Sequence, residues 1–173
     1  MKIMQVLYTG LGGTGSVAFS IIDGQKEKKR YENFLLFYGI ENLNLEYKKK
    51  CKKLKIKYIY KKKLRFVLNF DYLIKKSILM SPDVIIVHDI STIPFFIYSV
   101  YKRKTIIYVH HTPDKTKRII DWLRYFINGM FCHKIVLVSK RKKTDLMHRL
   151  NNIFFKKKVN IIENGIDIKK FSK

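Results

Sequence analysis

The stretch VLYTGLGGTGSVAFSII, residues 6–22, decides the fold of this chain. An apolar strand pattern at Ile3–Thr9 runs into a glycine-rich turn at Gly10–Gly15, and a helical pattern follows at Ser16–Lys26. Glycines let the backbone turn tightly, and the amides at a helix N-terminus can hold an anion. The stretch therefore predicts the first strand–turn–helix unit of a layered α/β domain.

The rest of the chain repeats this alternation of apolar strand patterns with helical patterns. We expect further strands at 33–40, 55–60, 84–87, 105–109, 134–138 and 159–162, and helices at 64–79, 91–101, 114–131 and 140–150. Continuous apolar strands separated by helices are typical of parallel sheets covered on both faces. The sequence therefore predicts one doubly wound, mostly parallel Rossmann-like domain of about seven strands, spanning 1–173.

The charge balance has two interpretations. The 173 residues include 37 Lys and Arg against 13 Asp and Glu, a net charge of +24, with 47% hydrophobic residues. The apolar content excludes a wholly disordered chain. A field this positive favours nucleic acid, anionic lipid or phosphorylated ligands. The 30 Lys against 7 Arg are equally typical of an AT-rich genome, so the charge does not identify a partner.

The basic segment between Lys48 and Arg65 has eleven Lys or Arg residues and no acid. We expect it to be a loop or edge strand, which is either simply solvated or docks on an anionic membrane. No apolar run reaches the roughly 18 residues of a membrane span. The amino terminus has a strand pattern and not that of a signal peptide. Cys51 and Cys132 form no metal or disulfide motif, so we expect a cytoplasmic protein, peripheral at the inner face of the cell membrane.

Polar residues collect where the predicted strands end. His88 and Asp89 follow the strand at 84–87, His110 and His111 follow 105–109, and Ser139 follows 134–138. Ligands of doubly wound sheets bind at the carboxyl ends of the strands. This edge is therefore the candidate site, although strand-end histidines also serve purely structural roles.

Three other interpretations compete at this point. Gly10, Gly12 and Gly15 match GxGxxG, and Glu41 could bind a ribose, which suggests an NAD(P)-binding domain. The histidines could hold a metal, although they lack the spacing of known metal motifs. The charge alone suggests a nucleic-acid-binding module, but no recognition motif supports one.

The order of the motifs identifies a family resemblance. After the glycine turn come PDVIIVHD, TIIYVHHTP, KIVLVSKRKKTDL and VNIIENGIDIKKF. In this order they resemble the amino-terminal half of a GT-B glycosyltransferase of family 4. The last motif is similar to the family's segment before the interdomain hinge, which places the hinge-proximal residues at about 160–173.

The resemblance implies transfer of a sugar from a nucleotide-sugar to a glycan or lipid-linked acceptor, as in polysaccharide biosynthesis. It implies no cofactor, no metal and no specific nucleic acid. The family's second, carboxy-terminal donor-binding domain is absent from this chain. We therefore expect a partner domain, either fused or a separate chain, and little activity from the isolated chain.

The resemblance also suggests site residues. The loop facing the donor diphosphate matches Gly12, Gly13, Thr14 and Gly15. The histidine near the reacting sugar matches His111, or His110 if the alignment shifts by one residue. The acceptor side matches His88, Asp89 and Ser139.

Overall fold

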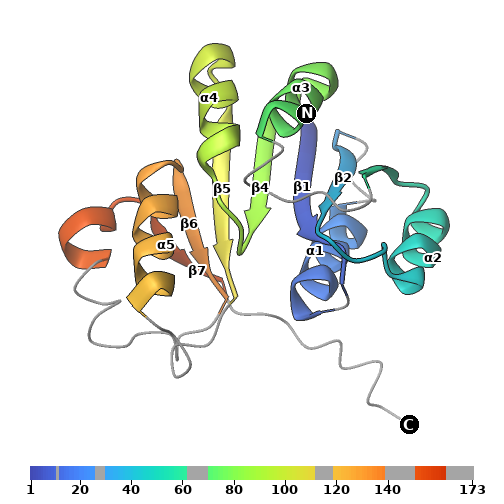
Figure 1. Cartoon of the computed structure of the whole chain (residues 1–173), viewed down its shortest axis with the longest axis horizontal. Helices are drawn as coiled ribbons and strands as arrows, with labels where there is room; N and C mark the ends of the chain where they lie inside the picture. Colours follow the sequence, from blue (N-terminus) through green and yellow to red (C-terminus); the bar gives the residue numbers. More distant parts are fainter. Residues whose placement is uncertain (11, 26–29, 62–69, 112–118, 139–150, 163–173) are drawn as a thin grey trace, which may run out of the picture.

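The strands form a single parallel sheet in the computed structural model, which describes residues 1–10, 12–25, 30–61, 70–111, 119–138 and 151–162 (Figure 1). The strands are β1 (Lys2–Tyr8), β2 (Glu32–Tyr38), β3 (Lys57–Tyr60), β4 (Val84–His88), β5 (Thr105–His110), β6 (Lys134–Leu137) and β7 (Val159–Ile161). Within the described residues, the sheet has seven strands in the order β3-β2-β1-β4-β5-β6-β7. Every pairing is parallel, which confirms the predicted Rossmann-like sheet.

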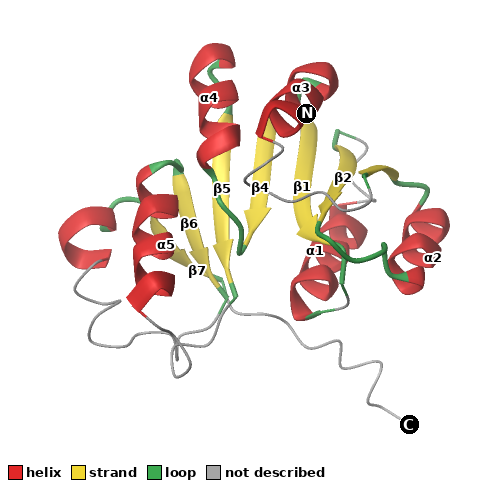
Figure 2. Cartoon of the chain, viewed as in Figure 1, coloured by secondary structure: helices red, strands yellow, loops and turns green. Residues whose placement is uncertain are grey.

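The helices divide between the two faces of the sheet (Figure 2). They are α1 (Gly13–Gln25), α2 (Leu45–Leu54), α3 (Phe70–Met80), α4 (Ile93–Lys102), α5 (Ile119–Met130) and the π-helical turn η4 (Asn151–Phe155). The chain winds from β1 outward to β3, then crosses back and winds the other way to β7. Because such crossovers are right-handed, α1 and α2 cover one face, here called the first face, and α3, α4 and α5 cover the second face.

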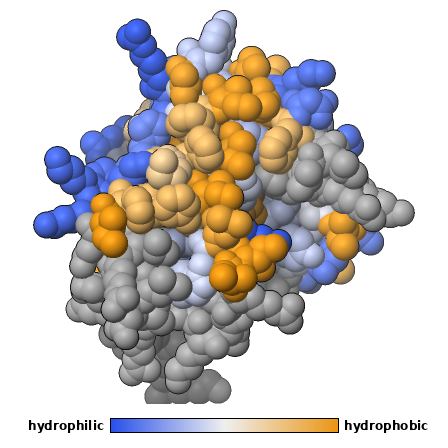
Figure 3. Space-filling model, turned by 60° about the vertical axis from the view of Figure 1, so that its left-hand side comes forward, coloured by the Kyte–Doolittle hydropathy of each residue, from blue (hydrophilic) through white to orange (hydrophobic). Residues whose placement is uncertain are grey.

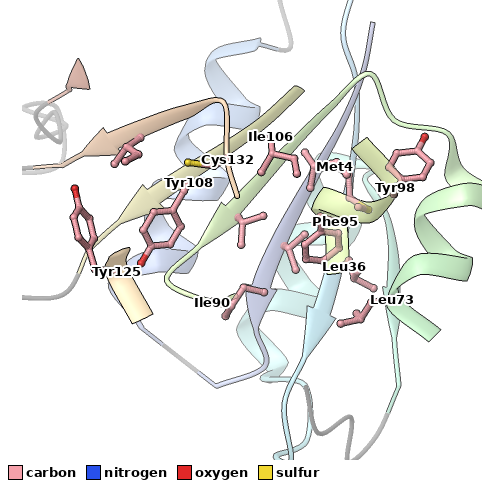
Figure 4. Packing of buried hydrophobic residues seen from close by; sticks show 14 of the residues in the cluster. Met4, Leu36, Leu73, Ile90, Phe95, Tyr98, Ile106, Tyr108, Tyr125 and Cys132 are labelled. Carbon is pink, nitrogen blue, oxygen red and sulfur yellow. The ribbon is translucent and has the colours of Figure 1, made fainter. Parts of the chain in front are cut away.

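The side-chain packing agrees with this division. On the first face, Phe19 and Ile22 of α1 and Tyr47 of α2 pack on Leu7 and Phe37 of the sheet. The second face carries the larger core, in which α3, α4 and α5 contribute Leu73, Phe95, Tyr98 and Tyr125 (Figure 4). Burial of such large side chains stabilises the fold by about 1.5–3 kcal/mol each.

The basic segment differs from its prediction. Its first part, Lys48–Leu54, is helical in α2, and only β3 is the expected edge strand. Asn44 caps α2 by accepting the Glu46 amide through its side chain, at 2.8 Å. Tyr47 and Cys51, four residues apart, anchor the inner side of α2, whereas the lysines between them are exposed or half-buried. The helix was missed because so few of its residues are apolar.

Other element boundaries shift by a few residues. The first helix begins at Gly13 and not at Ser16, so half of the predicted glycine turn is helical. Helix α4 begins at Ile93 and not at residue 91, the start of the predicted helix. The helices expected at 64–79 and 114–131 are confirmed where the structure describes them, whereas the one expected at 140–150 lies outside the described residues. The turn η4 was not predicted.

Candidate functional site

The candidate site lies at the edge of the sheet where the strands end. The strand order reverses between β1 and β4, and helix α1 begins at this same edge (Figure 1). A strand-order reversal opens a crevice for ligands beyond the carboxyl ends of the strands. The polar groups that the sequence predicted at strand ends therefore meet where a ligand of this fold class binds.

The glycine turn has an open part and a packed part. A Cβ atom at Gly13 would meet no atom within 4 Å, and one at Gly12 would meet only the Thr14 hydroxyl at 3.9 Å. At Gly15 a Cβ would overlap the ring and hydroxyl of Tyr47. Gly15 is therefore explained by packing against α2, whereas Gly12 and Gly13 leave room for a ligand.

Tyr47 also holds the turn in place. Its hydroxyl accepts a hydrogen bond from the Gly12 amide at 3.1 Å and lies 3.3 Å from the Gly12 carbonyl, to which it donates. Burial raises the pKa of Tyr47, an effect that the Gly12 bond partly offsets. The amino end of α1, with Gly13, Thr14 and Gly15 in its first turn, is thus fixed by a side chain of α2. Its helix dipole favours an anion at this end.

Glu41, the candidate ribose ligand of an NAD(P) site, lies beside the same turn. A Cβ atom at Gly10 would approach a Glu41 carboxylate oxygen and the Tyr8 ring to 2.7 Å. A hydrogen bond from Tyr8 to Glu41 raises the pKa of the Tyr8 hydroxyl. Gly10 is therefore required by close packing.

His110 points to the second face and pairs with Asp89. Its Nδ1 lies 3.0 Å from a carboxylate oxygen of Asp89, and its ring packs 5.0 Å from that of Tyr125. The same carboxylate accepts the His111 amide at 2.9 Å. Asp89 has φ of 50°, a left-handed conformation that Asp tolerates better than most residues.

The pKa of Asp89 reflects this pairing. Burial alone would raise it, but the hydrogen bond and positive charge of His110, with the His111 amide, hold it below the ordinary value. Asp89 therefore stays ionised and ties the ends of β4 and β5 together.

His111 points the opposite way and meets His88 on the first face. His88 Nδ1 lies 3.0 Å from His111 Nε2, and the two rings are stacked. His88 Nε2 lies 3.1 Å from the side-chain oxygen of Gln5 on β1. Burial and the nearby His111 lower the pKa of His88 to about 3, against the opposing charge of Asp89. His88 is therefore neutral, and His111 is half-buried at the rim.

The structure thus brings together His88, Asp89, His110 and His111 at one edge with the amino end of α1. His88 is buried and reaches the rim through His111. Ser139 lies outside the described residues. The described residues hold no group of three or more His, Cys, Asp or Glu arranged to bind a metal.

Two contributors were missed by sequence reasoning, Gln5 and Tyr47. Gln5 is fully buried among apolar neighbours in the middle of β1. An isolated polar residue in an apolar strand indicates a buried hydrogen-bond partner, and the sequence showed this pattern. Tyr47 carried no such signal, because its role depends on how α2 packs against α1.

Within the described residues, no helix is long and apolar enough to cross a bilayer.

Several solved structures share this fold, and two of them hold UDP or a UDP-sugar. HepE of Anabaena, in complex with UDP and glucose, superposes with a TM-score of 0.72 at 15% identity, covering 98% of this chain and 46% of that chain. The lipopolysaccharide outer core galactosyltransferase WaaB gives 0.71 at 16% identity, covering 97% and 47%. UDP-GlcNAc 2-epimerase of Neisseria meningitidis, bound to UDP-GlcNAc, gives 0.63 at 13% identity, covering 95% and 46%.

At these identities the likeness establishes the fold alone, that of one half of a GT-B enzyme. This chain spans less than half the length of each of these proteins. No curated protein sequence matches it significantly.

The family comparison is more specific than the fold. The profile described as Glycosyltransferase Family 4 matches residues 12–170. Neither a dinucleotide-binding nor a nucleic-acid-binding interpretation gains support from these comparisons. The chain belongs to glycosyltransferase family 4 and represents the amino-terminal half of such an enzyme.

Proposed function

We propose that this chain is the acceptor-side half of an enzyme that moves a sugar from a nucleoside-diphosphate sugar to a hydroxyl of a glycan or lipid-linked acceptor. The observation that carries the proposal is that the open Gly12–Gly13 turn and His111 lie at the same edge of the sheet, where the strands end. HepE, which has this fold, was solved with UDP and glucose, and this supports a uridine diphosphate donor.

Each group has a chemical role in the proposal. As the sugar leaves, negative charge grows on the departing diphosphate. The amino end of α1 would stabilise that charge with backbone amides and the helix dipole, which needs no metal. His111 would hydrogen-bond a hydroxyl of the reacting sugar or of the acceptor. Asp89 holds the backbone of His111 through its amide.

The donor side would come from a second Rossmann-like domain. The chain spans about half of the matched enzymes, and closure of two domains excludes water from a transfer site. In the proposal, the isolated chain has little transferase activity, and a fused or separate carboxy-terminal domain completes the site.

The test compares two neighbouring histidines in the completed enzyme. We expect His111→Ala to lower turnover at least about tenfold, since a lost acid–base or hydrogen-bonding group costs about 10²–10⁴, with thermal stability nearly unchanged. His110→Ala should instead lower stability, because it removes the buried partner of Asp89. Parent-like turnover by His111→Ala would contradict the assignment.

A binding experiment separates the proposal from its rival. Titrating the completed enzyme with UDP-glucose and with NAD⁺ should give saturable binding only for the nucleotide-sugar. Binding of NAD⁺ alone would favour the dinucleotide-binding interpretation.

We further propose that the protein works at an anionic membrane surface, and that it docks through the helices of the second face. The α4–α5 face is defined by exposed apolar side chains of α4, α5 and η4: Ile97, Val100, Tyr101, Ile120, Leu123, Met130, Ile153 and Phe154. Figure 3, which turns this side forward, shows a broad apolar band bordered by hydrophilic side chains. Contiguous apolar surface of this kind marks an interaction site.

Aromatic contacts make the three elements one surface. The rings of Phe96 and Phe131 lie 5.0 Å apart and join α4 to the end of α5. The rings of Phe126 and Phe154 lie 5.2 Å apart and join α5 to η4. The apolar side chains therefore form a continuous patch.

The charge around the patch points to lipid as its occupant. Lys102 and Arg103 follow Tyr101 at the end of α4, and Lys156 and Lys157 follow η4, all of them exposed. An apolar face with a basic border suits an anionic bilayer, into which apolar side chains insert while lysines meet the headgroups. A second copy of a chain with net charge +24 would be repelled.

A further inference from the structure

The buried hydrogen-bond chain behind His111 starts at a group whose role is unambiguous. The backbone carbonyl of Ala18 can only accept, and it lies 3.4 Å from the side-chain nitrogen of Gln5. The opposite orientation of the Gln5 amide would place its oxygen against that carbonyl oxygen. Gln5 therefore presents its oxygen to His88, and an amide oxygen only accepts.

The next link fixes the proton of His88. Since the Gln5 oxygen accepts, His88 must carry its hydrogen on Nε2, at 3.1 Å. His88 is buried, with 2% of its surface exposed, and is neutral with a pKa of about 3. A neutral imidazole has one N–H, so Nδ1 of His88 is an acceptor.

The last link fixes His111. Its Nε2 lies 3.0 Å from the acceptor Nδ1 of His88, so His111 Nε2 must donate. In neutral His111 the lone pair is then on Nδ1. Asp89 accepts hydrogen bonds from the His111 backbone amide and from the ring of His110.

We propose that Gln5 and His88 are positioning residues that set the tautomer of His111, so that His111 donates at Nε2 to His88 and accepts at Nδ1. The tautomer follows from the structure alone, whereas its use in sugar transfer rests on the proposed function. With this tautomer, His111 accepts a hydrogen bond from a hydroxyl of the sugar or acceptor, and its own proton stays bound to the protein. His88 thereby acts on the site without touching the substrate.

The test reads the tautomer directly by ¹⁵N NMR of the histidine rings in the 173-residue chain near pH 7.5. We expect Nε2 of both His88 and His111 to resonate as protonated nitrogens and Nδ1 of both as unprotonated ones. A hydrogen bond of ordinary net strength favours one tautomer by about five- to tenfold. A neutral His88 or His111 carrying its proton on Nδ1 would overturn the proposal.

Variants separate positioning from simple packing. Gln5→Leu removes the acceptor that orients His88 but keeps similar side-chain volume, and we expect the tautomer preference of His111 to fall about fivefold. His88→Asn keeps an oxygen acceptor near the position of Nδ1, and we expect it to retain the preference. An unchanged preference in a folded Gln5→Leu protein would contradict the proposal. If Gln5→Leu does not fold, the parent spectrum still decides.

The outcome is independent of the transfer assay. The expected tautomers in an enzyme that transfers no sugar would leave the positioning chain intact and refute the proposed function. Sugar transfer by an enzyme whose His111 carries its proton on Nδ1 would leave the proposed function intact and refute the positioning role of Gln5 and His88.

Discussion

The helices on the two faces of the sheet present opposite surfaces to solvent. On the first face, α2 exposes lysines to solvent, whereas Gln5 and His88 are buried beneath the helical layer. On the second face, Thr92 and Asn128 are buried and hydrogen-bond each other between helices, whereas the outward surfaces of α4 and α5 carry exposed apolar side chains. Even the consecutive histidines divide, since His111 meets His88 on the first face and His110 meets Tyr125 on the second.

The comparison shows that net charge alone does not locate an interface. The lysines of α2 lie on the solvated side of a helix whose inner residues Tyr47 and Cys51 are buried, so they need no partner. The exposed apolar residues of α5 are the ones that water solvates poorly, with Leu123 56% exposed. The first face thus positions the candidate site, and the second supplies most of the core and the proposed docking surface.

The largest expected effect is a loss of stability in acid that comes from the first face. The pKa of His88 is about 3 in the folded protein and about 6.5 in an unfolded chain. Below pH 6.5 the unfolded state therefore binds a proton that the folded state does not, and stability falls as pH falls. We expect a loss of about 2–3 kcal/mol in the free energy of unfolding between pH 6.5 and 4.5, at up to about 1.4 kcal/mol per pH unit.

Urea unfolding at several pH values measures this loss. Working above pH 4.5 avoids Asp89, whose lowered pKa matters only in stronger acid. His88→Asn should flatten the pH dependence relative to the parent protein. On the second face, burial raises the pKa of Cys132 to about 11 and that of Tyr108 well above its ordinary value, so both stay neutral as pH falls. If the stability of His88→Asn depended on pH as steeply as that of the parent, the loss in acid would not come from His88 on the first face.

The next effect tests how tightly α1 and α2 pack on the first face. A Cβ atom at Gly15 would overlap Tyr47, whereas one at Gly24 of the same helix would meet nothing within 4 Å. We expect Gly15→Ala to destabilise the protein by about 2 kcal/mol through overpacking, and Gly24→Ala to stabilise it by about 0.5–1 kcal/mol. Thermal or urea unfolding measures both.

The second face offers a matched glycine. A Cβ atom at Gly129 of α5 would overlap the ring of Phe155 in η4, so Gly129→Ala should cost about as much as Gly15→Ala. For the first face, equal stabilities of the Gly15→Ala and Gly24→Ala variants would mean that the Tyr47 side chain moves freely and does not fix the glycine turn.

The sequence predicted the sheet because its strands are short, continuous apolar runs between helical patterns. It also predicted the edge where the polar residues meet, since parallel strands carry all their carboxyl ends to one side. The alternation of side chains along a strand even implies that His110 and His111 face opposite ways. Their partners could not be predicted, because these depend on the register that aligns His88 with Val109 across β4 and β5.

Helix α2 illustrates the other limit. Five lysines among its ten residues conceal an inner side that has only Tyr47, Cys51 and Leu54. Such a helix is stabilised by tertiary packing more than by its own pattern. The basic segment therefore looked like a loop or an edge strand until the packing of Tyr47 was known.

The smallest expected effect decides between the two surfaces that could meet a membrane. We expect Ile120→Gln with Leu123→Gln, which leaves the charge unchanged, to weaken binding to anionic vesicles about tenfold. Each side chain is about half exposed and contributes roughly 0.7 kcal/mol on insertion, so that the two together account for about tenfold. The matched variant on the first face is Lys49→Gln with Lys53→Gln, two exposed lysines of α2. It should weaken binding less than about threefold, and only at low salt, because charges away from the contact act through the screened field.

Co-sedimentation with vesicles of increasing anionic lipid content, at low and physiological salt, measures both variants. Loss of binding in the lysine variant alone would indicate that the protein docks through the first face. A parent protein that sediments as a dimer without vesicles, and becomes monomeric in the Ile120 and Leu123 variant, would show that the apolar surface pairs two copies of the chain and not chain with lipid.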